Sequence, residues 1–166
     1  KGKWREAYEV LAATNDFPEF TGRICPALCE KSCVLKLSCD EPVTIRENEA
    51  AIAEAAFREG YIVPIQPQRN GKRVAIIGAG PAGLSAACRL NAKGYEVTGG
   101  LLRYGIPNFK LDKAVIDRRM GVLEAEGIKF EMGVTVDVQN LPAGFDAYCI
   151  CTGTPQARDL NIPGRE

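Results

Sequence analysis

The sequence predicts an α-helical segment with clustered cysteines, followed by an α/β segment with a parallel sheet. Up to about residue 60 the pattern is one of helices and loops, and beyond residue 72 strands and helices alternate. Residues 61–72, between the two patterns, carry two prolines, two glutamines and a glycine without periodicity, which is typical of an extended linker. We place the domain boundary near Gln68, giving domains of residues 1–67 and 68–166.

The first predicted helix has one apolar stripe, formed by Trp4, Ala7, Tyr8 and Leu11. It runs to about Ala13, and we expect Asn15 and Pro18 to end it. Residues 25–43 carry two prolines and are predicted to be irregular.

The second predicted helix covers residues 45–58. Thr44 to Glu47 has the S/T-x-x-E form of a capping box, and Gly60 follows the end of the helix.

The α/β segment is predicted from alternating elements. Strands are expected at residues 73–77, 95–98, about 128–132 and 147–151, and helices at 81–93 and 113–126. Gly94 and Gly127 follow the two helices, as glycine often does at helix C-termini. Ile116, Met120 and Leu123 share one face of the second helix, so we expect them in the core.

The composition excludes several classes of protein. Of the 166 residues, 46% are hydrophobic and 25% charged, which is typical of a globular chain. The formal net charge is zero, which gives no overall field for nucleic acid or an anionic membrane. The absence of histidine excludes histidine bases and histidine-ligated zinc. No run approaches the ~20 apolar residues of a membrane-spanning helix.

A glycine-rich loop joins the first strand to the next helix. Residues 74–83 read VAIIGAGPAG, a buried strand that runs into G-x-G-x-x-G at Gly78, Gly80 and Gly83. The first glycine permits the turn, the second lets a pyrophosphate approach, and the third lets helix and strand pack closely. The phosphate would lie at the helix N-terminus. We interpret this loop as dinucleotide-binding rather than as an ordinary tight turn.

The loop alone does not distinguish FAD from a nicotinamide cofactor. An acidic residue that binds a ribose hydroxyl is expected ~20 residues further on, at the end of the second strand. In this sequence Thr98 is followed directly by Gly99 and Gly100, so that residue and its loop are absent.

The seven cysteines are an odd number, and four of them are clustered. Cys25, Cys29 and Cys33 are spaced C-x3-C-x3-C, and Cys39 follows. Without a secretory signal, this set predicts reduced thiols or metal ligands in a cytoplasmic protein. Thiolates suit iron-sulfur clusters and zinc, but the spacing is neither that of ferredoxins nor the paired C-x2-C of zinc sites. We expect the other three, Cys88, Cys149 and Cys151, to be small core residues.

Glu49 falls on the apolar face of the predicted helix 45–58. A carboxylate there is costly unless it is paired. It could be a fourth, oxygen ligand beside the cysteines, it could pair with an arginine such as Arg23 or Arg46, or it could reach solvent.

Five motifs in order identify a family. They are NDFPEFTGRICPALCEKSCVL, PVTIRENE, GAGPAG, GGLLRYGIPNFKLDK and CTGTPQARDLNIPG. Together they resemble the small (beta) subunit of NADPH-dependent glutamate synthase. The same flavin and iron-sulfur unit is found in dihydropyrimidine dehydrogenase and the NAD(P)-ferredoxin transhydrogenases.

The resemblance implies an α-helical iron-sulfur domain, of the alpha-helical ferredoxin type, followed by part of a Rossmann-like α/β FAD-binding domain. It implies a 4Fe-4S cluster and FAD, with NADPH bound by a later domain of the complete enzyme. The implied metal ligands are Cys25, Cys29, Cys33 and Glu49. Cys39 has no counterpart in the family pattern.

The resemblance also implies which residues bind FAD. Those at the pyrophosphate are Gly78, Gly80, Ala82 and Gly83. Those on the flavin side are Gly100, Leu101 and Arg103. The backbone of Val136 would contact adenine, and Thr152 and Gly153 would form a second flavin-phosphate turn.

The sequence also departs from the family pattern. It lacks a further C-x2-C-x4-C-x3-C set, the acidic ribose-binding loop and the NADPH domain. We therefore expect an incomplete portion of such an enzyme, without NADPH oxidation of its own.

Two functions follow from these features. In the first, the chain is part of an FAD- and iron-sulfur-dependent NAD(P)H oxidoreductase that passes electrons from NADPH through FAD to iron-sulfur centres. The acceptor would be a larger catalytic subunit or a ferredoxin-like protein, and the chain could form a homo-oligomer. The cofactor carries the chemistry, so no catalytic acid or base is expected. In the alternative, the chain is a catalytically silent, metal-stapled assembly module without bound FAD, and zinc at the cysteines would be its sign.

Overall fold

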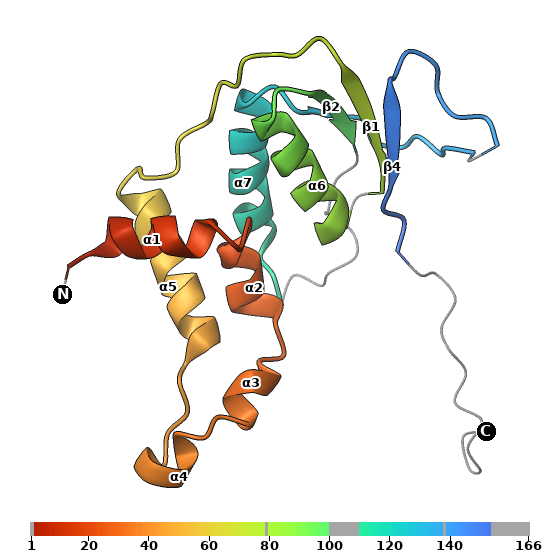
Figure 1. The fold of residues 1–166 in the computed structure, drawn as a ribbon. Helices are drawn as coiled ribbons and strands as arrows, with labels where there is room; N and C mark the ends of the chain where they lie inside the picture. Colours follow the sequence, from red (N-terminus) through yellow and green to blue (C-terminus); the bar gives the residue numbers. More distant parts are fainter. Residues whose placement is uncertain (1, 79, 100–109, 138, 154–166) are drawn as a thin grey trace, which may run out of the picture.

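The first part of the chain is helical in the computed structural model, which describes residues 2–78, 80–99, 110–137 and 139–153 (Figure 1). Its helices are α1 (Trp4–Ala12), α2 (Pro18–Ile24), α3 (Leu28–Lys31), α4 (Lys36–Cys39) and α5 (Ile45–Arg58). α1 and α5 are the two predicted helices, and α5 has the predicted bounds. α2, α3 and α4 are additional to the prediction. None of the helices in these described ranges is long and apolar enough to cross a membrane.

Pro18 was predicted only to end the first helix, but it also begins a second helix, α2. It occupies the first position of α2, where a missing N–H is harmless and the fixed φ of proline suits the helix. Phe17 and Phe20 at this end are buried, and their ring centroids are 5.3 Å apart. The prediction missed α2 because its seven residues are too few to show helical periodicity.

α5 packs closely against α2. A Cβ atom on Gly22 would lie 2.6 Å from the backbone nitrogen of Ala50, so glycine is needed for this approach.

The predicted capping box is wrong in its geometry. Within the described chain the Thr44 hydroxyl caps no backbone N–H, and it lies 3.5 Å from Asn48 Oδ1 instead. The ψ angle of Thr44 is 63°, whereas a capping residue is usually extended.

The second part of the chain is an α/β unit. Its elements are β1 (Arg73–Ile77), α6 (Pro81–Ala92), β2 (Glu96–Gly99), α7 (Lys113–Ala125), β3 (Lys129–Phe130) and β4 (Ala147–Ile150). All four strands pair in parallel, in the order β3-β2-β1-β4. The predicted α/β fold class is confirmed, and each predicted strand and helix of this unit is present with slightly shifted ends. β2 and β4 flank β1 on opposite sides, which creates a topological switch point.

The main core lies between the sheet and the helices α6 and α7, which cover one of its faces (Figure 1). Ile116, Met120 and Leu123 of α7 are buried there, as predicted. Phe17 and Phe20 belong to the same apolar cluster. The helical part therefore packs on α6 and α7 and shares their core.

Residues 61–72 are extended, as predicted, and their second half is anchored to the α/β unit. The Arg69 guanidinium donates to Asn91 Oδ1 at 2.7 Å, and to the carbonyl oxygens of Tyr95 and Glu126 at 2.7 and 2.8 Å. These bonds join the linker to α6 and to the end of α7. The boundary between residues 67 and 68 stays a prediction.

Candidate functional site

The glycine-rich loop brings the ends of β1 and β4 together. Gly78 has a φ of +125°, and a Cβ atom there would lie 2.2 Å from the carbonyl oxygen of Cys151. A Cβ atom on Gly83 would lie 2.4 Å from the carbonyl oxygen of Gly78. The first glycine therefore serves the turn and strand contact, and the third serves the contact of the helix with the loop.

Gly80 needs a different explanation. Its φ of −79° suits any residue, and a Cβ atom there would meet no atom of the described chain within 4 Å. Protein packing alone therefore does not require glycine at this position. Gly80 is the N-cap of α6, where backbone N–H groups of the first turn are available to an anion. A ligand that lies against this backbone would account for the glycine.

A cavity of about 630 Å³ opens at the carboxyl ends of the strands. It is bordered by the ends of β1 and β2 and by residues of the segment between β3 and β4. Three predicted cofactor-binding residues line it together, namely Gly78, Val136 and Thr152. A cavity beside a topological switch point is the usual ligand position in open α/β sheets.

Glu131 is a lining residue of this cavity that the sequence analysis missed. It follows β3 directly, and its backbone N–H donates to the carbonyl oxygen of Gly99 at 3.0 Å. Glu131 therefore places an acidic residue at the end of β3. This strand is the neighbour of β2, at whose end the sequence analysis expected an acidic residue. The predicted strand 128–132 includes Glu131, so no sequence signal marked it, and only the strand order places it beside β2.

The other predicted cofactor-binding residues are distributed as follows. Ala82 lies in the exposed first turn of α6, and Gly153 follows Thr152 with a φ of +72°. Gly100, Leu101 and Arg103 lie outside the described residues.

The predicted metal ligands lie along the chain between α2 and α5. Cys25 caps the C-terminus of α2, Cys29 lies in α3, and Cys33 lies between α3 and α4. Cys25 and Cys29 are exposed free thiols, and Cys33 is half-buried. Among the described residues, no group of three or more Cys, Asp or Glu side chains is placed to hold a metal ion.

The donor chemistry of this stretch nevertheless suits a soft metal. Backbone N–H groups of Val43 and Leu35 donate to Cys33 and lower the pKa of its thiol, which favours the thiolate that a metal binds. A metal site rarely exists in an unfolded segment, so the binding of a metal can be coupled to the folding of the segment that holds it. The thiols therefore fit a cluster by their chemistry, and binding would have to draw them together.

Glu49 lies against α2, close to the helix end that carries Cys25. Its Oε2 accepts a hydrogen bond of 2.7 Å from the Thr21 hydroxyl. Arg23, one of the arginines considered as its partner, pairs with Glu54 instead, at 2.9 Å. The hydrogen bond from Thr21 is a partner that sequence reasoning did not consider, and the role of Glu49 as a ligand stays a prediction.

The three remaining cysteines pack against the core, as predicted. Cys88, Cys149 and Cys151 are half-buried beside the main apolar cluster. Burial raises the pKa of the Cys88 thiol to about 11, so this thiol stays protonated at neutral pH. The sulfur atoms of Cys149 and Cys151 are 3.6 Å apart.

Two protein families match successive parts of the chain. Residues 1–61 match dihydropyrimidine dehydrogenase domain II, 4Fe-4S cluster. Residues 64–148 match pyridine nucleotide-disulphide oxidoreductase. The two matched ranges meet within the extended linker.

Individual relatives are similar along the whole chain. The chain is 49% identical to the glutamate synthase [NADPH] small chain of Bacillus subtilis over 179 residues, which cover 100% of this chain and 36% of the relative. Identity to the small chain from Mycobacterium tuberculosis H37Rv is 48%, with the same coverage. The glutamate synthase [NADH] of Schizosaccharomyces pombe is 48% identical over 100% of this chain and 8% of its own length. The resemblance inferred from the sequence motifs is thereby confirmed, and the chain spans about a third of the small chains it matches.

Proposed function

The chain belongs to the pyridine nucleotide-disulphide oxidoreductase family, and on that basis we propose that it is part of an FAD- and iron-sulfur-dependent NAD(P)H oxidoreductase of the glutamate synthase small-subunit type. Its role would be to hold FAD and an iron-sulfur cluster side by side. The observation that carries the proposal is Gly80, a glycine at the start of α6 that neither backbone conformation nor packing within the described chain explains.

We assign the FAD pyrophosphate to the start of α6, between Gly78 and Gly83. Val136 and Thr152 line the adjoining cavity and would contact the rest of the cofactor. The proposed residues on the pyrophosphate side are Gly78, Gly80, Ala82, Gly83 and Gly153. Those on the flavin side are Gly100, Leu101 and Arg103.

We assign the 4Fe-4S cluster to Cys25, Cys29, Cys33 and Glu49. When bound, FAD supplies hydride acceptance and one-electron release, and the cluster supplies one-electron transfer. The residues of this chain bind and orient the two groups, and none is needed as an acid or base. The same proposal includes NADPH as the electron donor and a larger catalytic subunit or a ferredoxin-like protein as the acceptor. It also includes homo-oligomer formation and a cytoplasmic location.

The FAD assignment is tested by Gly80→Val in chain refolded with FAD. We expect the variant to fold but to lose flavin absorbance, because the new side chain would occupy the space of the pyrophosphate. Gly121→Val is the matched control, because Gly121 lies on α7 and a Cβ atom there also meets no atom of the described residues within 4 Å. Retention of flavin by Gly80→Val would contradict the assignment.

The cluster assignment is tested by Cys29→Ala after anaerobic reconstitution with iron and sulfide. We expect loss of the brown chromophore and of bound iron, with the α/β unit still folded. Cys39→Ala is the matched control, because Cys39 is also an exposed thiol of this region but is outside the proposed ligand set. Equal iron content in the two variants would refute the assignment.

The second candidate function is a metal-stapled docking module. It is favoured by exposed apolar side chains around the cysteines, namely Leu28, Val34 and Leu37. Metal analysis of purified chain separates the candidates. Iron with sulfide supports electron transfer, and stoichiometric zinc supports the docking module.

A further inference from the structure

The two parts of the chain meet at an interface of opposite charges. Three carboxylates of the helical part each contact an arginine of the α/β unit. The pairs are Asp16 with Arg89, Glu19 with Arg119, and Glu54 with Arg118. In all three pairs the helical part supplies the carboxylate and the α/β unit supplies the arginine. This arrangement favours one way of docking the two parts together.

The central pair is buried. Arg119 Nε lies 2.5 Å from Glu19 Oε1, and a second guanidinium nitrogen lies 3.1 Å from Oε2. The side chain of Glu19 is 0% exposed and that of Arg119 is 7% exposed. A two-bonded contact between an arginine and a carboxylate fixes both distance and angle, which apolar packing does not.

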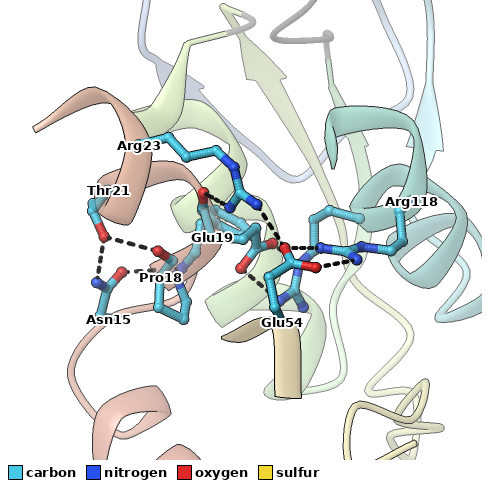
Figure 2. A network of polar contacts seen from close by, with 9 residues as sticks. Asn15, Pro18, Glu19, Thr21, Arg23, Glu54 and Arg118 are labelled. Carbon is cyan, nitrogen blue, oxygen red and sulfur yellow. Dashed lines mark hydrogen bonds and ion pairs between the residues drawn. The ribbon is translucent and has the colours of Figure 1, made fainter. Parts of the chain in front are cut away.

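The second pair, whose contacts are drawn in Figure 2, lies at the partly exposed rim of the interface, because the side chains of Arg118 and Glu54 are 34% and 37% exposed. Two guanidinium nitrogens of Arg118 lie 2.9 and 2.6 Å from the carboxylate oxygens of Glu54. The same guanidinium lies 3.7 Å from the ring centroid of Phe57. Arg23 of α2 also donates to Glu54, at 2.9 Å, so this carboxylate joins α2, α5 and α7.

The third pair attaches the helical part to the helix that follows the glycine-rich loop. Arg89 lies 2.6 Å from Asp16 Oδ1, and the Ser85 hydroxyl donates to Asp16 Oδ2 at 2.5 Å. Both partners of Asp16 belong to α6, whose first turn is the proposed pyrophosphate site.

Two of the three carboxylates, Glu19 and Glu54, lie on elements that carry or adjoin the proposed cluster ligands. Glu19 lies on α2, which ends at Cys25. Glu54 lies on α5, little more than one turn after Glu49. We propose that these three ion pairs are a positioning device, formed by Asp16, Glu19, Glu54, Arg89, Arg118 and Arg119, which holds the cluster-bearing helices at a fixed distance from the cofactor-binding helix α6. The purpose assigned to the device rests on the proposed function, because electron transfer between two cofactors slows steeply with distance.

The device is tested by reversing its two partly exposed arginines in Arg89→Glu/Arg118→Glu. Each change places a carboxylate opposite a carboxylate without disturbing the buried pair. We expect the two parts to separate more often, so that thermolysin cleaves the linker at residues 61–65 about tenfold faster and the radius of gyration rises in solution scattering. Both measurements use the chain without cofactors.

Two controls accompany this variant. Lys3→Glu/Lys31→Glu makes the same change in net charge at exposed positions outside the interface and the linker, and it should behave like the unaltered chain. Arg89→Lys/Arg118→Lys keeps the charges but loses the two-bonded contact of Arg118, so its cleavage should be closer to that of the unaltered chain than to that of the charge-reversal variant. If the charge-reversal variant does not fold, Arg89→Gln/Arg118→Gln removes the attraction without adding repulsion and should still accelerate cleavage several-fold.

The unaltered chain and the folded interface variant could show the same rate of linker cleavage and the same radius of gyration. That result would overturn the positioning device. In chain reconstituted with FAD and cluster, the interface variant should keep its flavin and iron contents, and photoreduced flavin should reduce the cluster more slowly than in the unaltered chain. Equal cluster reduction rates would overturn the proposed purpose of the device. Failure of the unaltered chain to bind FAD or iron would refute the proposed function instead, and the cofactor-free measurements would still decide whether the device exists.

Discussion

The α/β unit and the cysteine-bearing segment differ in how they are held together. In the α/β unit, side chains of α6, α7 and the sheet form one buried cluster. In the described residues 25–45, Ala27 is the one buried apolar side chain, and Leu37 is 89% exposed. α2 and α5 lie between these extremes, because they pack on each other and on the α/β unit.

This difference separates two sources of stability. Burial of apolar side chains is sufficient to hold an α/β unit in place. The cysteine-bearing segment buries too little apolar surface for that, and its short helices α3 and α4 have four residues each. Such a segment gains order from what it binds, and free thiols are the groups through which it would do so.

The strongest way to break the link between the two parts is Arg119→Met. This change leaves the buried Glu19 carboxylate without its partner, and we expect a loss of about 3–5 kcal/mol in the free energy of unfolding. Urea unfolding followed by circular dichroism measures the loss. A loss below about 1 kcal/mol would show that Glu19 finds another partner or water.

The double variant Glu19→Met/Arg119→Met is the control for that result. It removes both charges and keeps side chains of similar bulk, so it should recover most of the lost stability. If the double variant is as unstable as the single one, the loss comes from packing or from the hydrogen bond between Arg119 and Tyr8, which both variants lose, rather than from the unpaired charge.

A second pair of variants compares the two regions directly. Leu123→Ala should cost about 2–5 kcal/mol, because Leu123 is 1% exposed in the core. Leu37→Ala should change stability by less than about 0.5 kcal/mol in metal-free chain, because its side chain already lies in water. Both values come from urea unfolding. A large cost for Leu37→Ala would mean that the cysteine-bearing segment has a core of its own.

The two regions also differ in how well their sequences predict structure. In the α/β unit, hydrophobic periodicity and terminal glycines place each helix and strand to within a few residues. In the helical part, α5 is long enough to show its period, whereas α2 is recognisable only from Pro18 in its first position. Ala27, before α3, has a φ of +49°, a left-handed conformation that alanine does not signal.

The candidate site divides in the same way. The spacing of Gly78, Gly80 and Gly83 predicts the loop, because the three glycines lie within six residues, between a strand and a helix that the sequence also predicts. Glu131 is brought to the cavity by the strand order, and Thr21 is brought to Glu49 by the packing of α2 on α5. Contacts between residues far apart in the sequence depend on tertiary packing, and no local pattern predicts them.

The pH dependence of the rim pair is a small predicted effect, and it sharpens the contrast with the buried pair. Hydrogen bonds from Arg118, and then from Arg23, lower the pKa of Glu54 below its usual value of 4.5. The ionised carboxylate therefore stabilises the folded chain above about pH 4.5, and this contribution is lost as the pH falls through the lowered pKa. The Glu54 side chain is 37% exposed, so we expect less than about 1 kcal/mol. The difference in unfolding free energy between the unaltered chain and Glu54→Gln should shrink between about pH 6 and about pH 3. A difference that stays constant over this range would show that Glu54 contributes through its shape rather than its charge.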